Sequence, residues 1–314
     1  MTQRRLALLI AGPTASGKSA LALALARRFG GTVINADSMQ LYRELRVLTA
    51  RPTPAEEALA PHRLYGIRPA AEAASVAWWR EAALAEMERA ALPILCGGTG
   101  LYFLSLTEGL SAIPPVPPEA RAEARALLAT LGAPGVHARL DAETAARLRP
   151  GDSQRIARAY EVLRGTGRGL AAWQREAPQT GPAPWRFAAI RLDPPREVLR
   201  EAIAARFDAM LAGGAMEEVR DLLAQDLDPA LPAMRAHGVP ELAAVLRGAM
   251  ALEAARDRAI LNTGQYTKRQ ATWFRHHELA APSGAHIIHA RMAGRAQFQE
   301  SELAEIFAFV EGRR

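Results

Sequence analysis

The hydrophobic positions alternate along the chain between short continuous runs and patterns with helical spacing. The run from Leu6 to Ala11 is apolar and bounded by polar residues, which is typical of a buried parallel strand. The stretch from Ala20 to Arg28 is rich in Ala and Leu, and Gly30 and Gly31 after it supply a helix stop. These patterns predict a strand followed by a helix at the start of the chain.

Two further strands are expected in the first third of the chain. Residues 31–38 form a short apolar segment that ends in Asp37 and Ser38, and residues 92–98 form an apolar run that ends in glycines. Between them, residues 75–91 carry apolar side chains at helical spacing. Since ligand sites in open α/β sheets lie beyond the carboxyl ends of the strands, the loops after these three strands should meet at one edge of a sheet.

The middle of the chain is a helical block between two proline-rich breaks. Residues 113–118 read Ile-Pro-Pro-Val-Pro-Pro, which predicts a stiff extended hinge, and residues 178–184 form a second break rich in Pro and Gly. The pattern between them is helical from Glu119 to about Arg168, which predicts an inserted helical domain. Within this block, helix breaks are expected at Gly132, Pro134, Pro150-Gly151 and Gly165.

The remainder of the chain returns to the first pattern and is then mostly helical. We expect a strand at residues 186–192, helices at 196–211, 216–224 and 252–278, a weak strand at 286–289 and a C-terminal amphipathic helix. The predicted fold is therefore α/β, a P-loop core with a central, mostly parallel sheet flanked by helices, together with an all-helical insertion. The expected boundaries are residues 1–112 for the first part of the core, 113–185 for the insertion and 186–314 for the rest of the core.

Composition narrows the class of protein. The net charge of +6 and the isoelectric point near 10.0 point to a polyanionic partner, although a GC-rich genome also enriches arginine. Cys96 is the only cysteine, so an internal disulfide and a cysteine-based zinc site are excluded. No apolar run reaches the length of a membrane span and no signal-peptide layout opens the chain, so we expect a cytoplasmic protein without a membrane partner, and a monomer.

A glycine-rich segment directly follows the first predicted strand and fits the phosphate-binding pattern G-x-x-x-x-G-K-[ST]. In such a loop, backbone N–H groups and a helix N-terminus surround an anion, Lys18 adds a charge and Ser19 can reach a magnesium ion. Nucleotide binding, including ATP binding, is the commonest use of this loop, and a chance match is the alternative. The loop consists of Gly12, Pro13, Thr14, Ala15, Ser16, Gly17, Lys18 and Ser19.

Two polar residues at neighbouring strand ends are candidates for chemistry. Asp37 can act as a general base, can hold magnesium through water, or can simply cap a helix or loop. Thr99 lies in the glycine-rich turn of residues 97–102, where its hydroxyl can orient a substrate or cap the next helix.

Two stretches outside these strand ends combine cations with other polar or aromatic residues. If residues 151–161 are helical, Arg155 and Arg158 share a face that can hold phosphates or read a base edge; an exposed face with an Arg155–Asp152 ion pair is the simpler interpretation. Residues 262–275 mix aromatic residues, which can be core, with outward cations. The seven histidines do not have the spacing of a metal site.

Several motifs together resemble the bacterial tRNA dimethylallyltransferases, also called tRNA isopentenyltransferases. They run in the order of that family over nearly the whole chain and separate it from ordinary P-loop kinases. They are the phosphate-binding loop, Asn35-Ala36-Asp37-Ser38-Met39-Gln40-Leu41-Tyr42, Gly97-Gly98-Thr99-Gly100-Leu101-Tyr102, Asp152-Ser153-Gln154-Arg155-Ile156-Ala157-Arg158, Glu217-Glu218-Val219 and the run from Gln265 to Arg275.

This resemblance implies a reaction and a set of roles. Dimethylallyl diphosphate would donate its prenyl group to N6 of the adenosine on the 3′ side of the anticodon, in tRNAs that read codons beginning with U, and diphosphate would leave. The P-loop would hold that diphosphate with Mg²⁺, Asp37 would take the N6 proton, Thr99 would position the adenine, and the insertion would grip the anticodon stem-loop. The resemblance implies tRNA contacts at Asp37, Ser38, Met39, Gln40, Thr99, Arg121, Gln154, Arg155, Ile156, Ala157 and Arg158.

One segment departs from that family. Many relatives have Ile-Gly-Tyr-Lys-Glu where this chain has Ala236-His237-Gly238-Val239-Pro240-Glu241, so a tRNA contact through the Tyr or Lys is lost here. Three other classes compete with the leading hypothesis: a small-molecule P-loop kinase, an adenylate isopentenyltransferase that prenylates a free nucleotide, and an RNA-binding ATPase module. The large arginine-bearing insertion argues against the first two, and the lack of an apolar run ending in adjacent acids argues against the third.

Overall fold

The structure is a computed structural model that describes residues 4–111, 113–176, 180–292 and 300–314. The chain divides into two compact units, of which one is built from Met1–Thr107 and Pro184–Arg314 and the other from Glu108–Ala183. We call them the core unit and the helical unit. The helical unit starts before the expected boundary at residue 113 and ends before residue 185.

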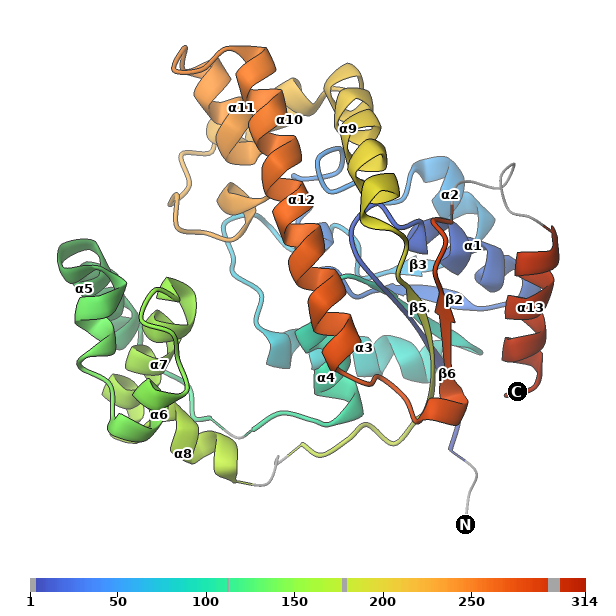
Figure 1. The fold of residues 1–314 in the computed structure, drawn as a ribbon, viewed down its shortest axis with the longest axis horizontal. Coiled ribbons are helices and arrows are strands. Elements are labelled where there is room, and N and C mark those ends of the chain that lie inside the picture. The colour runs from blue at the N-terminus through green and yellow to red at the C-terminus, as the bar shows by residue number, and fades with distance from the viewer. Residues whose placement is uncertain (1–3, 112, 177–179, 293–299) are drawn as a thin grey trace. The chain divides into compact units, whose positions relative to one another are not determined.

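The core unit contains one parallel sheet in the order β3-β2-β4-β1-β5-β6 (Figure 1). Strand β4 lies between β1 and β2, and its carboxyl end is level with both, since Gly97 pairs with Ala11 and Cys96 pairs with Asn35. The loops after these three strands therefore emerge side by side, as the sequence predicts. The strands are β1 (Leu6–Ala11), β2 (Thr32–Asn35), β3 (His62–Arg63), β4 (Pro93–Gly97), β5 (Arg186–Leu192) and β6 (Ala285–Ile288).

Most helices of the core unit lie at the predicted positions, whereas the helices at Pro54–Leu59 and Val239–Leu246 were not predicted. Helix α1 ends at Gly30, which adopts the left-handed conformation and donates its N–H to Ala26, and Ser75 caps α3 by accepting a hydrogen bond from the N–H of Trp78. The helices are α1 (Lys18–Phe29), α2 (Pro54–Leu59), α3 (Val76–Arg89), α4 (Gly100–Thr107), α9 (Arg196–Ala212), α10 (Ala215–Leu223), α11 (Val239–Leu246), α12 (Leu252–His276) and α13 (Glu300–Glu311), with short 3-10 turns at Met39–Leu41, Ala233–Arg235 and Pro282–Gly284.

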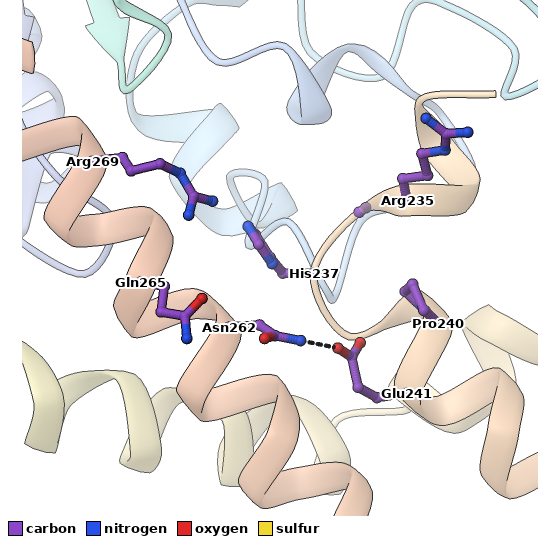
Figure 2. Close-up of a pocket in the computed structure, with 8 residues that line it drawn as sticks. Arg235, His237, Pro240, Glu241, Asn262, Gln265 and Arg269 are labelled. Atoms are coloured by element: carbon purple, nitrogen blue, oxygen red, sulfur yellow. Dashed lines mark hydrogen bonds between the residues drawn. The ribbon is translucent and has the colours of Figure 1, made fainter. Parts of the chain in front are cut away.

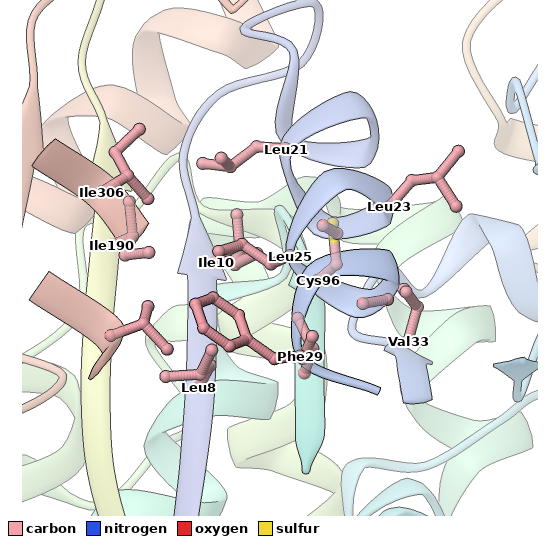
Figure 3. Packing of buried hydrophobic residues seen from close by; sticks show 14 of the residues in the cluster. Leu8, Ile10, Leu21, Leu23, Leu25, Phe29, Val33, Cys96, Ile190 and Ile306 are labelled. Carbon is pink, nitrogen blue, oxygen red and sulfur yellow. The ribbon is translucent and has the colours of Figure 1, made fainter. Parts of the chain in front are cut away.

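The main hydrophobic core lies on one face of the sheet (Figure 3). Alternate residues of β1, Leu8 and Ile10, meet Leu21 and Leu25 of α1, and all four side chains are fully buried. The C-terminal helix α13 closes the same face, where Phe307 packs edge-to-face on the ring of Phe29 with centroids 5.7 Å apart. This packing fixes β1 against α1 and so fixes the loop that joins them.

A second core cluster is formed by α9, α10, α11 and α12 together with residues 42–48. Phe207 of α9 and Leu242 of α11 are among its buried members. It anchors the segment that follows Asp37.

The helical unit consists of α5 (Pro118–His137), α6 (Ala142–Ala146), α7 (Ser153–Thr166) and α8 (Leu170–Arg175). Helix α5 is kinked at Gly132, which has non-helical backbone angles, and α7 begins after the Pro150-Gly151 break as predicted. The predicted break at Gly165 is wrong, because α7 continues through it and ends at Gly167; at Gly165 the helix instead packs closely on Val116 and Pro117.

Other differences from the sequence predictions are small. Strand β3 was not expected, since two residues are too few to produce a hydrophobic pattern. Pro178 and the residue after it, in the second predicted break, lie outside the described residues. Among the helices that the structure describes, none has a stretch long and apolar enough to cross a membrane.

Candidate functional site

The loop between β1 and α1 has the backbone conformation of a phosphate-binding loop. Gly12, Ala15 and Gly17 have positive φ, and the N–H of Ser16 bonds the carbonyl of Pro13 at 3.3 Å. The N–H groups in the first turn of a helix point out of its N-terminus. At the start of α1 the N-cap residue is Gly17, which has no side chain to bond them. An anion at this end of α1 would meet both these donors and the positive end of the helix dipole.

The segment after β6 lies against this loop. Met292 donates its N–H to the carbonyl of Ser16 at 2.9 Å, and Arg291 donates its Nε to the carbonyl of Ala15 at 2.9 Å. A Cβ on Gly17 would overlap the carbonyl of Met292, and its φ of 95° also disfavours a side chain there. The loop is therefore held from outside as well as by its own turn.

Lys18 points back into the loop. Its Nζ donates to the carbonyl of Pro13 at 2.7 Å. Burial lowers the pKa of Lys18 to about 8, while the nearby Cys96 and Asp37 act in the opposite direction. The ammonium thus sits in a desolvated position, where its interaction with a phosphate is stronger than at the surface.

Asp37 and Thr99 are brought together by backbone hydrogen bonds between two strand ends. The N–H of Thr99 bonds the carbonyl of Ala36 at 3.1 Å, and the N–H of Ser38 donates to Thr99 Oγ1 at 3.0 Å. Asn35, which is fully buried, accepts the N–H of Asp37 at 2.7 Å. The Asp37 carboxylate accepts the N–H of Met39 at 3.0 Å, which leaves its other oxygen for a substrate.

The charge of Asp37 reaches groups from several elements. It acts on the pKa values of Lys18 of the P-loop, Arg206 of α9, His237 before α11 and Tyr266 of α12. In each case burial is the larger cause, lowering the pKa of the cations and raising that of the tyrosine. Asp37 therefore lies at the centre of a partly desolvated cluster, which is typical of a catalytic site.

Arg206 is a site residue that the sequence does not single out. It extends from the middle of α9, donates to the carbonyl of Thr49 at 3.3 Å, and influences the pKa of Lys18. Its Nε is buried and has no hydrogen-bond partner among the described residues. The buried Ser16 hydroxyl in the P-loop is unpartnered in the same sense. A bound anion could accept hydrogen bonds from both the Arg206 Nε–H and the Ser16 hydroxyl.

Gln40 and Glu218 organise the loop that follows Asp37. Gln40 uses its side-chain amide internally and donates to the carbonyls of Thr49 and Ala50 at 2.9 and 3.1 Å. Glu218 of α10 accepts three consecutive backbone N–H groups, from residues 46, 47 and 48, at 2.6, 2.6 and 2.9 Å. The motif around Glu218 thus has a structural explanation, since it fixes the loop that carries Ser38 and Gln40.

A pocket of about 220 Å³ lies between α12 and the turn before α11 (Figure 2). His237 enters it opposite Arg269 and packs on the ring of Tyr266, with centroids 5.0 Å apart. Glu241 is buried and holds the turn by accepting from the N–H of Gly238 at 3.1 Å and from Asn262 Nδ2 at 2.7 Å. This is the segment that departs from the family pattern, and here His237 and the cations Arg235 and Arg269 line the pocket.

Most of the remaining cationic and aromatic residues of 262–275 are explained by packing. Arg275 is paired with Asp193 at 2.8 Å, Phe274 is buried, and Trp273 stacks on His277 with centroids 4.0 Å apart. Lys268, Arg269 and Arg275 are all exposed, as predicted, and the guanidinium of Arg275 is engaged by Asp193.

In the helical unit, the predicted tRNA-contacting residues fall into two groups. Gln154, Arg155 and Arg158 are exposed on α7. Ile156 is fully buried in the core of the unit, so the predicted tRNA contact of its side chain is replaced by a packing role. Ala157 is half-buried.

The arginines of this unit differ in how firmly they are paired. Arg155 pairs with Asp152 at 3.5 Å and Arg158 with Glu161 at 3.4 Å, as the simpler interpretation expects, but such exposed pairs are weak and readily exchanged for phosphate. Arg121 on α5 is exposed, and among the described residues no acidic side chain forms an ion pair with it.

Metal binding by protein side chains alone is not supported in the part of the chain that the structure describes. It contains no group of three or more His, Cys, Asp or Glu residues arranged to hold an ion. Ser19 stands in the first turn of α1, and its hydroxyl is close enough to the buried Cys96 thiol to influence the pKa of that thiol. A magnesium ion here would take most of its ligands from phosphate and water, which is its common mode at phosphate sites.

Comparisons with known proteins match the chain to transferases of isopentenyl or dimethylallyl groups. Residues 40–277 match the family described as IPP transferase, and residues 6–69 match the one described as isopentenyl transferase. The chain is 60% identical to the tRNA dimethylallyltransferase of Acidiphilium cryptum over 306 residues, 96% of this chain and 94% of that protein. It is 58% identical to the tRNA dimethylallyltransferase of Granulibacter bethesdensis over 317 residues, 99% of both chains.

Solved structures extend the likeness to the fold. The full-length tRNA isopentenylpyrophosphate transferase from Bacillus halodurans matches with a TM-score of 0.68 and 30% identity, over 99% of this chain and 96% of that chain. A eukaryotic dimethylallyltransferase acting on tRNA matches with a TM-score of 0.78 and 23% identity, over 99% and 80% of the two chains, and supports the fold alone.

Proposed function

Because the chain belongs to the IPP transferase family, we propose that it transfers the dimethylallyl group of dimethylallyl diphosphate to tRNA. The acceptor is N6 of the adenosine on the 3′ side of the anticodon, in tRNAs that read codons beginning with U, and the reaction takes place in the cytoplasm. The observation that carries the proposal is the meeting of the P-loop, Asp37 and Thr99 at the carboxyl ends of three adjacent strands.

The P-loop binds the diphosphate of the donor. Three features suit a diphosphate group: the outward N–H groups at the start of α1, the desolvated Lys18 and the unpartnered Ser16 hydroxyl. Arg206 adds a second cation from α9. These groups stabilise the charge that develops on the diphosphate as it leaves.

Asp37 acts as the base. An exocyclic amine is a poor nucleophile, so its proton must be removed as N6 attacks C1 of the dimethylallyl group. In this step the N6–C1 bond forms, the C1–O bond to diphosphate breaks, and the N6 proton passes to the Asp37 carboxylate. Thr99, which is held beside Ser38, positions the adenine. The adenine enters by flipping out of the anticodon loop, because its N6 is not reachable while it is stacked.

Magnesium fits the same site through Ser19 and the donor's phosphates. When bound, it supplies positive charge that neutralises the leaving diphosphate. Ser19 is the residue that would hold it, since its hydroxyl lies in the first turn of α1 next to Lys18.

The helical unit binds the anticodon stem-loop. Its exposed Gln154, Arg155 and Arg158 on α7, with Arg121 on α5, supply an amide and three guanidiniums for phosphates and base edges. Such a unit favours tRNA over a free adenine nucleotide as the acceptor.

An assay of acceptor specificity tests the proposal. The protein is incubated with Mg²⁺, dimethylallyl diphosphate and one of three acceptors: unmodified tRNA, AMP or ATP. We expect prenylated adenosine only in the nuclease digest of the tRNA. Product only from AMP or ATP would identify an adenylate isopentenyltransferase, and diphosphate release without prenylated tRNA would refute the transfer reaction.

A further inference from the structure

Gln270 is a buried polar residue of α12 that reaches beyond its own helix. Its side chain is 5% exposed. The N–H of Thr14 in the P-loop donates to Gln270 Oε1 at 2.8 Å, and Gln270 Nε2 donates to the carbonyl of Gly98 at 2.9 Å. One amide therefore joins the loop after β1 to the loop after β4.

The fit at Gly98 is tight. A Cβ at this position would overlap Gln270 Nε2, so a residue without a side chain is needed for the amide to reach the Gly98 carbonyl. Gly98 directly precedes Thr99, whose backbone and hydroxyl bond the segment of Asp37 and Ser38. A continuous chain of hydrogen bonds thus runs from Thr14 through Gln270 to the Asp37 loop.

We propose that Gln270 is a positioning residue that sets the spacing between the diphosphate-binding loop and the loop that carries Thr99. The proposal rests on the function proposed above, in which the first loop holds the donor and the second positions the acceptor base. Two reactants must be held within a few tenths of an ångström of the attacking geometry, and a misplacement of about 1 Å can cost roughly 100-fold in rate.

The chemistry of the amide explains why glutamine is needed. Thr14 presents a donor and Gly98 presents an acceptor, so the bridging side chain must accept at one end and donate at the other. A carboxylate can accept from Thr14 but sets an oxygen against the Gly98 carbonyl, and an apolar side chain of similar length leaves both backbone groups unpaired.

The first test is the Gln270→Met variant, with Gln225→Met as a matched control at an exposed position after α10. For the folded Gln270→Met variant we expect kcat at saturating donor and tRNA to fall by about tenfold or more, while the Kd for tRNA stays within about threefold. Gln270→Glu should show the same split, and Gln225→Met should match the wild type. A residue that only stabilises the fold would lower the melting temperature and leave kcat per folded enzyme unchanged.

The second test approaches the same contact from Gly98 and does not remove the amide. Gly98→Ala displaces the Gln270 amide, so it should lower kcat by a similar factor. Because both substitutions disrupt the same Gln270 bridge, the double variant should be no slower than the slower single variant. The same kcat as the wild type in the folded Gln270→Met and Gln270→Glu variants, or fully multiplicative effects in the double variant, would overturn the proposal.

The wild-type arm separates this inference from the proposed function. If the wild type does not prenylate tRNA, the proposed function fails and the positioning role with it. If the wild type prenylates tRNA and the Gln270 variants turn over equally fast, only the positioning role fails.

Discussion

In the core unit, the candidate residues are held by hydrogen bonds to neighbouring backbone groups and to the buried Asn35 side chain, whereas in the helical unit they are exposed side chains on a helix. Asp37 is fixed by Asn35 and by the N–H of Met39, and Thr99 by Ser38 and Ala36. Arg155 and Arg158 have only weak surface partners. This difference suits two tasks. Transfer of the dimethylallyl group needs a fixed geometry, while contacts to tRNA phosphates tolerate mobile guanidinium groups. Substitutions in the two units should therefore affect different constants.

The largest effect is expected from Asp37→Asn. The amide keeps an acceptor for the N–H of Met39, so the loop should fold, but it cannot take the N6 proton. We expect the single-turnover rate to fall by about 1,000-fold with the Kd for tRNA within a few-fold. Asp221→Asn on the exposed face of α10 is the control. Wild-type turnover in Asp37→Asn would remove Asp37 as the base.

Removal of the divalent metal should have the next largest effect. Without Mg²⁺, part of the charge on the leaving diphosphate is no longer neutralised, and we expect a loss of about 100-fold in rate that is restored by added Mg²⁺. The measurement is initial rate after chelation with EDTA and after titration with MgCl₂, while the Kd for tRNA is followed at constant ionic strength. Full activity in excess EDTA would show that no metal takes part.

The pH dependence of donor binding should report on Lys18. Its pKa in the free enzyme is about 8, so the ammonium is present below pH 8 and lost as the pH rises through that value. Binding of an anion favours the charged form, so the KM for dimethylallyl diphosphate should be flat below pH 8 and rise by up to about tenfold per pH unit above it. Lys18→Arg, which stays charged, should remove this rise. A flat wild-type profile up to pH 9.5 would contradict the assignment.

The smallest effects are expected in the helical unit. Arg155→Ala and Arg158→Ala should each weaken tRNA binding a few-fold and lower the slope of log K against log salt by about 1, with kcat unchanged. Arg164→Ala on the same helix, whose guanidinium is bound to Glu123 at 2.8 Å, is the matched control. If both variants bind tRNA as the wild type does at every salt concentration, α7 is not the tRNA-binding surface.

Local patterns predicted the parts of the site that depend on contiguous sequence. The apolar runs indicate β1, β2 and β4, and because parallel strands direct their carboxyl ends to one edge of the sheet, the sequence alone predicts that the P-loop, Asp37 and Thr99 lie together. The cap at Ser75 and the stop at Gly30 were also predictable, because both act within one helical turn.

Residues that act across long distances in the chain were not predictable in this way. Arg206 is one of several arginines in α9, and only the packing of α9 shows that it, rather than Arg200, lies near Lys18. Gln270 lies 256 residues from Thr14, so its bridge depends on how α12 packs. Gly165 was misjudged because the requirement for glycine comes from Val116 and Pro117 rather than from a helix end.

The most direct test of the central claim is a single-turnover reaction that counts both products. Enzyme in excess, with Mg²⁺ and dimethylallyl diphosphate, is mixed with unmodified tRNA, and prenylated adenosine and diphosphate are measured over time in the same samples. The account predicts that both appear with one rate constant and in a 1:1 ratio, and that Asp37→Asn slows both together. Diphosphate that appears without prenylated adenosine, or prenylated adenosine formed at the wild-type rate by Asp37→Asn, would contradict it.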